Sequence, residues 1–98
     1  MFEIRQGDEG EVVLTGRLDA AQCEKAQQFF DGLPAPHIVD MAALDYISSA
    51  GLGVLMKTQK RIMANGGGLR LINVNHHIGD IFRFSGFDQI FEIVRAAD

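Results

Sequence analysis

The chain opens with alternating hydrophobic and polar positions, the pattern of a strand with one buried face. Apolar residues alternate with charged ones over Phe2–Gln6, and a second apolar run covers residues 11–15. Between them, residues 7–10 are of the types that tight turns favour. The pattern therefore predicts an N-terminal β-hairpin that ends at Gly16.

Farther along the chain, apolar residues recur every three or four positions, which is the spacing of an amphipathic helix. Shorter apolar runs lie between these segments and have the length of buried strands. The predicted helices cover residues 20–30, 49–64 and 76–85, and the predicted strands cover residues 37–41, 68–74 and 90–94. Strands that alternate with helices form parallel crossover units, so we expect an α/β fold.

Polar residues mark the helix boundaries. Asp19 with Gln22 resembles a capping box at the start of the first helix. Asn65 and the glycines after it end the second helix, and Asn75 is placed to cap the third. In the second helix, Gln59 is assigned to the polar face, together with the neighbouring lysines and arginine.

The composition narrows the class of protein. With 98 residues, 47% hydrophobic and 22% charged, the chain is predicted to be one soluble globular domain spanning residues 1–98. Its net charge of −4 argues against general nucleic-acid binding, which needs a basic surface. We expect no membrane insertion, because no apolar run approaches the roughly 20 residues of a span. The start of the chain shows no signal-peptide pattern, and the single cysteine, Cys23, fits a reducing cytoplasm.

Two adjacent serines stand where a predicted strand leads into the second helix. A hydroxyl at Ser48 or Ser49 can cap the helix by accepting a hydrogen bond from a free backbone N–H. The same position favours an anion, because unpaired N–H groups and the helix dipole point at it. A phosphate on one of these serines would therefore sit in a favourable field. Both roles, cap and phosphoacceptor, remain open at this point.

Four short motifs resemble a known family when they are taken in order. The run over residues 45–53 looks like the signature of STAS domains, a family named from sulfate transporters and anti-sigma factor antagonists. Residues 16–19 resemble its Gly-x-Leu-Asp motif, and residues 65–71 its Gly-Gly turn and following strand. Residues 84–91 resemble its closing helix end and last strand. Together these motifs cover nearly the whole chain.

The resemblance implies a single STAS-like domain with a mixed sheet of about five strands and helices packed mainly on one face. It also implies a function similar to that of bacterial anti-sigma factor antagonists, in partner switching that regulates transcription. Such a domain binds an anti-sigma factor that is also a serine kinase of the GHKL type, and phosphorylation releases it. A PP2C-type phosphatase reverses the modification. The resemblance further implies a cytoplasmic monomer that needs no cofactor and is not an enzyme.

The family phosphoacceptor corresponds to Ser49, which Ala50 and Gly51 follow. Ser48 replaces the aspartate that flanks the acceptor in the family, so Ser48 is the alternative site. Besides capping a helix, Asp19 has a second interpretation, in which it borders a surface pocket near the two serines. The expected partner-binding residues are Asp19, Tyr46, Ser48, Ser49, Ala50, Gly51 and Leu52.

Other functions remain open from the sequence. The chain is alternatively a non-phosphorylated STAS subunit that docks on an ABC transporter ATPase, an output module of two-component or biofilm signalling, or a binder of a small ligand or nucleotide. An enzymatic role is disfavoured, because no base is placed beside the serines by sequence. His37, His76 and His77 have no metal-site spacing, so we expect no metal. Residues 66–68 are glycines but precede a strand, the reverse of a phosphate-binding loop.

Overall fold

The computed structural model describes residues 1–96 and contains one mixed sheet of five strands in the order β1-β2-β3-β4-β5. β1 pairs antiparallel with β2, and each later pair of neighbours is parallel. The strands are β1 (Phe2–Gln6), β2 (Val12–Leu18), β3 (Ile38–Ile47), β4 (Arg70–Val74) and β5 (Glu92–Arg95). The predicted hairpin followed by parallel crossover units is confirmed.

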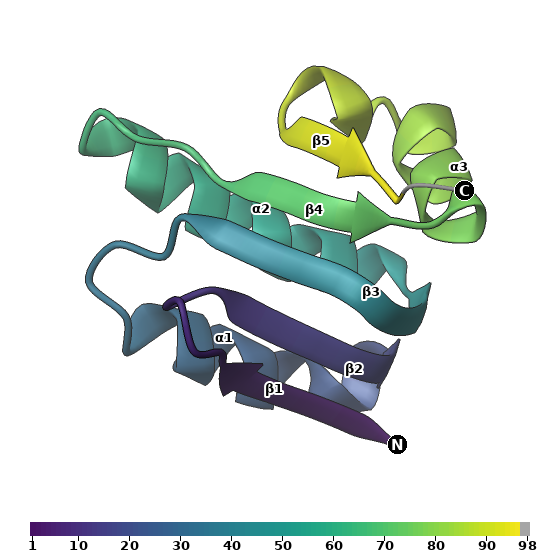
Figure 1. Cartoon of the computed structure of the whole chain (residues 1–98), viewed down its shortest axis with the longest axis horizontal. Coiled ribbons are helices and arrows are strands. Elements are labelled where there is room, and N and C mark those ends of the chain that lie inside the picture. The colour runs from purple at the N-terminus through teal and green to yellow at the C-terminus, as the bar shows by residue number, and fades with distance from the viewer. Residues whose placement is uncertain (97–98) are drawn as a thin grey trace.

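The helices lie mainly on one side of this sheet. Figure 1 shows α1 and α2 behind the strands and α3 beside the β4–β5 end. The α-helices are α1 (Cys23–Asp31), α2 (Ser49–Ala64) and α3 (His76–Ser85), and two 3₁₀ turns are η1 (Ala20–Gln22) and η2 (Phe87–Gln89). Within residues 1–96, no helix has both the length and the apolar character needed to cross a membrane.

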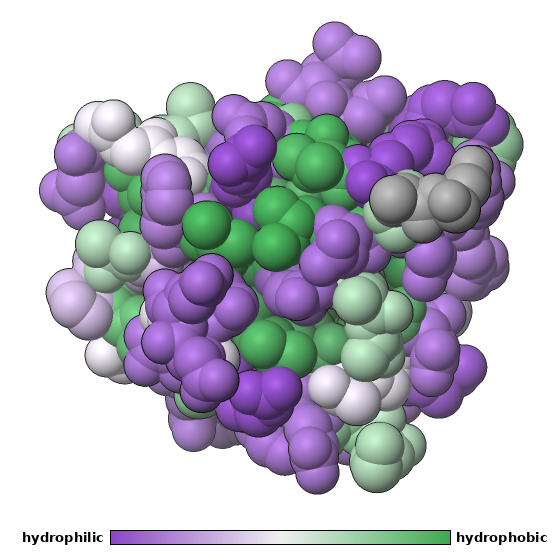
Figure 2. Space-filling model, viewed as in Figure 1, coloured by the Kyte–Doolittle hydropathy of each residue, from purple (hydrophilic) through white to green (hydrophobic). Residues whose placement is uncertain are grey.

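The core lies between the sheet and the helices. Leu14, Met41 and Leu71 of the strands belong to one hydrophobic cluster with Phe30 and Leu55 of the helices, and all five residues are fully buried. The opposite face of the sheet has no helix over it, and Figure 2 shows apolar residues gathered there inside a polar surround. Burial on one face explains why the alternating pattern identified β1 and β2 so readily.

Two strands extend farther than their sequence pattern predicted. β2 does not end at Gly16 but continues to Leu18. Gly16 has a φ of +90°, and a Cβ there would collide with the Met1 carbonyl oxygen, so glycine is required within the strand. β3 continues past Met41 to Ile47, and the pairing of β2 with β3 carries two register shifts. These irregularities interrupt the simple alternation on which the predictions relied.

β5 begins later than predicted, at Glu92 instead of residue 90. The 3₁₀ turn η2 precedes it, and the Phe91 N–H donates to the Phe87 carbonyl. This turn holds residues 90 and 91 out of the sheet although both are apolar.

The predicted capping box at Asp19 is wrong. Its carboxylate makes no hydrogen bond to the helix start. The chain instead forms η1, in which the Gln22 N–H donates to the Asp19 backbone carbonyl over 3.1 Å, and α1 starts only at Cys23. The backbone carbonyl thus satisfies a donor that the side chain was expected to take.

The assignment of Gln59 to the polar face of α2 is also wrong, because its side chain is 4% exposed. Its Oε1 accepts from the Leu69 N–H over 2.7 Å, and its Nε2 donates to the Ile90 carbonyl over 2.9 Å. The amide therefore links α2 to the start of β4 and to the segment before β5. The amide can be buried because its oxygen and its nitrogen each have a hydrogen-bond partner.

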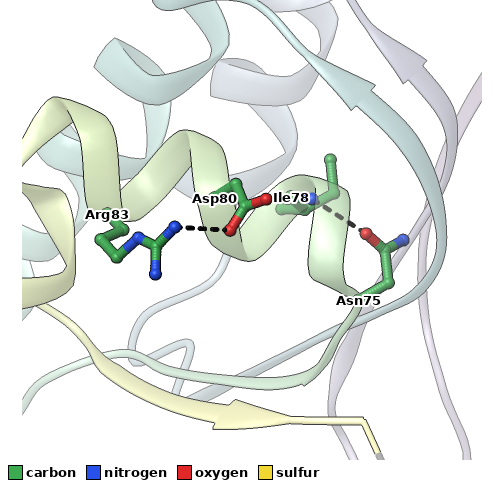
Figure 3. Close-up of polar contacts among 4 residues, drawn as sticks. All are labelled: Asn75, Ile78, Asp80 and Arg83. Atoms are coloured by element: carbon green, nitrogen blue, oxygen red, sulfur yellow. Dashed lines mark hydrogen bonds and ion pairs between the residues drawn. The ribbon is translucent and has the colours of Figure 1, made fainter.

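The predicted boundaries of α2 and α3 are confirmed. At the end of α2, Gly66 adopts a left-handed conformation with φ +87°. Asn75 caps α3 by accepting from the Ile78 N–H over 2.9 Å, as Figure 3 shows together with the Asp80–Arg83 ion pair. Asn75 is the single residue between the end of β4 and the start of α3.

Candidate functional site

Ser48 and Ser49 join the end of β3 to the start of α2, as predicted, but they are used differently. Ser48 is the N-cap, and its Oγ accepts from the Gly51 N–H over 3.1 Å. The same hydroxyl donates to the Leu18 carbonyl over 3.2 Å, and the Ser48 N–H donates to that carbonyl over 2.9 Å. Ser48 thus fastens the start of α2 to the end of β2.

Ser49 is the first residue of α2 and is exposed. Within residues 1–96 its hydroxyl makes no hydrogen bond. Adding a group to the Ser49 hydroxyl would leave the cap intact, whereas adding one to the Ser48 hydroxyl would remove the proton that it donates to the Leu18 carbonyl. Of the two serines, Ser49 presents the accessible hydroxyl.

The two serines are expected to differ in their effect on stability. Replacing Ser48 by alanine removes the cap and should lower the free energy of unfolding by about 1 kcal/mol. Replacing Ser49 by alanine removes no hydrogen bond and should change it by less than about 0.5 kcal/mol. Urea unfolding of both variants measures the difference. Equal losses would contradict the assignment of Ser48 as the cap.

Asp19 and Cys23 lie beside the serine joint. The Cys23 Sγ donates to the Asp19 carbonyl over 3.2 Å, and the thiol also contacts the Ser48 side chain. Burial raises the pKa of the Cys23 thiol, the Ser48 contact partly offsets this, and the Asp19 carboxylate raises the pKa further. The Oδ1 of Asp19 is buried and has no hydrogen-bond partner within the described residues.

Tyr46 is partly buried near the end of β3, and the guanidinium of Arg17 lies over its ring. The Arg17 Cζ is 4.4 Å from the ring centroid, within the range of a cation–π contact. Arg17 was not among the site residues predicted from the sequence. The only available signal was its place in the residue 16–19 motif, because its contact with Tyr46 depends on the β2–β3 register.

The remaining expected partner-binding residues, Ala50, Gly51 and Leu52, differ in their exposure to solvent. Ala50 is exposed beside Ser49, whereas Gly51 and Leu52 are buried. Gly51 packs closely against Leu18, and a Cβ at position 51 would lie 2.9 Å from the Leu18 Cγ. Gly51 and Leu52 therefore lie beneath the exposed residues and are not accessible to a partner.

Two cavities in the described part of the chain lie away from the serine joint. They have volumes of about 220 and 370 Å³. Neither is lined by Asp19, Ser48 or Ser49, so the expected pocket beside Asp19 is not among them. The first is lined by Val74, Asn75, His76, Arg95 and Ala96, and the second by His37, Gln59, Gly68, Leu69, Arg70 and Glu92. At the serine joint itself, Ser49 and Ala50 are exposed and Ser48 is partly buried.

Comparison with known proteins places the chain among relatives of the same architecture. A Bordetella bronchiseptica protein that carries the name anti-sigma factor antagonist BtrV is 36% identical over 61 residues. The match covers 62% of this chain and 53% of that protein, so the chain spans about half of the relative's length.

Solved structures of low sequence identity share the fold. A structure described as an anti-sigma factor antagonist of Thermotoga maritima has a TM-score of 0.77 at 20% identity, over 96% of this chain and 86% of that chain. The phosphorylated form of the Bacillus cell fate determinant SpoIIAA has a TM-score of 0.68 at 20% identity, over 100% and 93% of the two chains.

A family model described as "Mlab, STAS domain" matches residues 1–95. The ordered motifs, the mixed sheet with its N-terminal hairpin and the serine joint at the start of α2 agree with that match. The protein therefore belongs to the STAS domain family and has the fold of the anti-sigma factor antagonists.

Proposed function

We propose that this domain is a phosphorylation-regulated interaction module that acts as an anti-sigma factor antagonist. In the unphosphorylated state it binds an anti-sigma factor that is also a serine kinase of the GHKL type. The kinase phosphorylates Ser49 and the complex separates, and a PP2C-type phosphatase restores the binding form. The observation that carries this proposal is the exposed, unbonded Ser49 hydroxyl at the first position of α2.

The start of α2 can hold a phosphate without a change of fold. The Gly51 and Leu52 N–H groups are taken by the Ser48 hydroxyl and carbonyl, whereas Ser49 and Ala50 stand before the first i−4 helical bond. Their N–H groups and the helix dipole favour an anion. Phosphorylation therefore changes the surface and leaves the scaffold as it is.

Phosphorylation would act on the partner through charge. It adds roughly −1.5 to −2 charges at pH 7 to an exposed position of a domain whose net charge is already −4. A partner that covers Ser49 would have to desolvate this charge or meet it with an opposite one. A loss of about 1.4 kcal/mol in binding free energy already lowers affinity tenfold, so a modest penalty releases the partner.

The proposal predicts opposite behaviour for two substitutions at Ser49. Ser49→Asp places a negative charge at the contact surface and should weaken binding to the partner at least tenfold, whereas Ser49→Ala should bind within about twofold of the wild type. The measurement is the dissociation constant of each variant for the partner recovered with the unphosphorylated domain. Ser85→Asp, which adds the same charge at the far end of α3, is the control. Equal affinities of the two Ser49 variants would refute the switch.

A second candidate is a constitutive subunit that docks on an ABC transporter ATPase through the same surface. The observation that favours it is Ser48, which stands where the family has an aspartate beside the acceptor and is engaged as a helix cap. In this case Ser49 remains unmodified, and its exposed hydroxyl simply lies in the interface.

A further inference from the structure

Arg17 is an exposed cation that the proposed function leaves without a role. We propose that Arg17 receives the phosphate when Ser49 is phosphorylated, moving from the face of Tyr46 to the phosphate oxygens. This inference rests on the proposed function, because it specifies how the same serine switches the surface. The guanidinium of Arg17 would contact the Tyr46 ring in the unmodified protein and the phosphate in the phosphorylated protein.

The backbone brings Arg17 close to Ser49. Leu18 follows Arg17, Ser48 precedes Ser49, and the Leu18 carbonyl accepts hydrogen bonds from both the N–H and the hydroxyl of Ser48. Arg17 and Ser49 are thus the sequence neighbours of two hydrogen-bonded residues, Leu18 and Ser48. In the sheet, Arg17 is paired with Tyr46, three residues before Ser49. Arg17 and Ser49 therefore lie at the same edge of the sheet, where β2 and β3 end and α2 begins.

Arg17 is available for a new partner. Within residues 1–96 it forms no ion pair, and its recorded contact is with the Tyr46 ring. An exposed cation–π contact is weaker than a charge-assisted pair between a guanidinium and a phosphate, which can be bidentate. Asp19 lies beside the serine joint, and Asp45 precedes Tyr46 in the sequence. These carboxylates would raise the pKa of a phosphate near them, whereas Arg17 would lower it.

Transfer of Arg17 would change two parts of the surface at once. The phosphate would gain a counter-ion, which holds it against the start of α2. The Tyr46 ring, which lies beneath the guanidinium in the unmodified protein, would become uncovered. A partner that fits the Arg17–Tyr46 arrangement would therefore lose that arrangement as well as meeting the new charge.

The test uses full-length protein with phosphoserine encoded genetically at position 49, so it does not depend on any kinase. ³¹P NMR follows the second ionisation of the phosphate against pH, which in an unperturbed phosphoserine has a midpoint near about 6. Arg17→Gln removes the cation, and Arg5→Gln removes another exposed arginine at the other end of the hairpin. Thermal unfolding confirms that all variants are folded.

We expect the midpoint to be about 0.5 pH unit lower in the wild type and in Arg5→Gln than in Arg17→Gln. Tyr46 is the only tyrosine and there is no tryptophan, so tyrosine fluorescence and tyrosine ring NMR signals come from this residue alone. Phosphorylation should change these signals in the wild type but not in Arg17→Gln. An unchanged midpoint in Arg17→Gln, or unchanged Tyr46 signals in the phosphorylated wild type, would overturn the inference. Absence of phosphate on Ser49 in cells would instead refute the proposed function.

Discussion

Replacing Gln59 by leucine is expected to lower the free energy of unfolding by about 3 kcal/mol, although leucine is a better match to a buried helix position. The side-chain amide accepts from the Leu69 N–H and donates to the Ile90 carbonyl. Leucine leaves the buried Leu69 N–H without an acceptor and the Ile90 carbonyl without its donor. An unsatisfied buried donor costs more than the apolar side chain regains.

Urea unfolding measures this loss, with Gln28→Leu as the matched control. Gln28 is an exposed glutamine of α1 whose amide donates to Glu24 over 3.4 Å and has no other partner among residues 1–96. Its replacement should change stability by less than about 0.5 kcal/mol. A Gln59→Leu protein as stable as the wild type would mean that the amide does not hold α2 against the segments leading into β4 and β5.

Alanine is expected to have opposite effects at two glycines of the same helix. At Gly51 a Cβ would lie 2.8 Å from the Ile47 Cγ1 and 2.9 Å from the Leu18 Cγ, so close that one of the groups must shift. Gly51→Ala should therefore lower the free energy of unfolding by about 2 kcal/mol, because the start of α2 must move off β2.

Gly53 is exposed, and apart from its neighbours in α2 a Cβ there would meet no heavy atom within 4 Å. Gly53→Ala should raise the free energy of unfolding by about 1 kcal/mol, since alanine is the better helix former. Each variant adds one methyl group to α2, at positions that are two residues apart. A comparison of their unfolding curves therefore isolates the effect of packing at Gly51. A change of the same sign in both would show that α2 does not press on β2 at Gly51.

Features with a local cause could be predicted from the sequence. The hairpin follows from alternation, the boundaries of α2 and α3 follow from Asn65, Asn75 and the neighbouring glycines, and the parallel sheet follows from the order of elements. Features with a distant cause could not. Gly16 remains within a strand because of Met1, and Gln59 is buried because two backbone groups 10 and 31 residues away match its amide.

The same distinction holds for the site. The sequence located the joint between β3 and α2, because two serines stand before an apolar helical pattern. It left open which serine caps the helix, since that depends on the Leu18 carbonyl, 30 residues earlier in the chain. The stacking of Arg17 on Tyr46 also depends on strand pairing, so no local pattern indicated it.

The central claim is that Ser49 carries a reversible phosphate, and intact-mass analysis with phosphosite mapping of the protein from its native cells tests it most directly. The account predicts a species heavier by one phosphate that phosphatase treatment removes, with the phosphate mapped to Ser49. A phosphate on Ser48 would contradict the assignment of that hydroxyl as the engaged cap. No phosphate under any growth condition would contradict the switch itself and would favour the constitutive docking subunit.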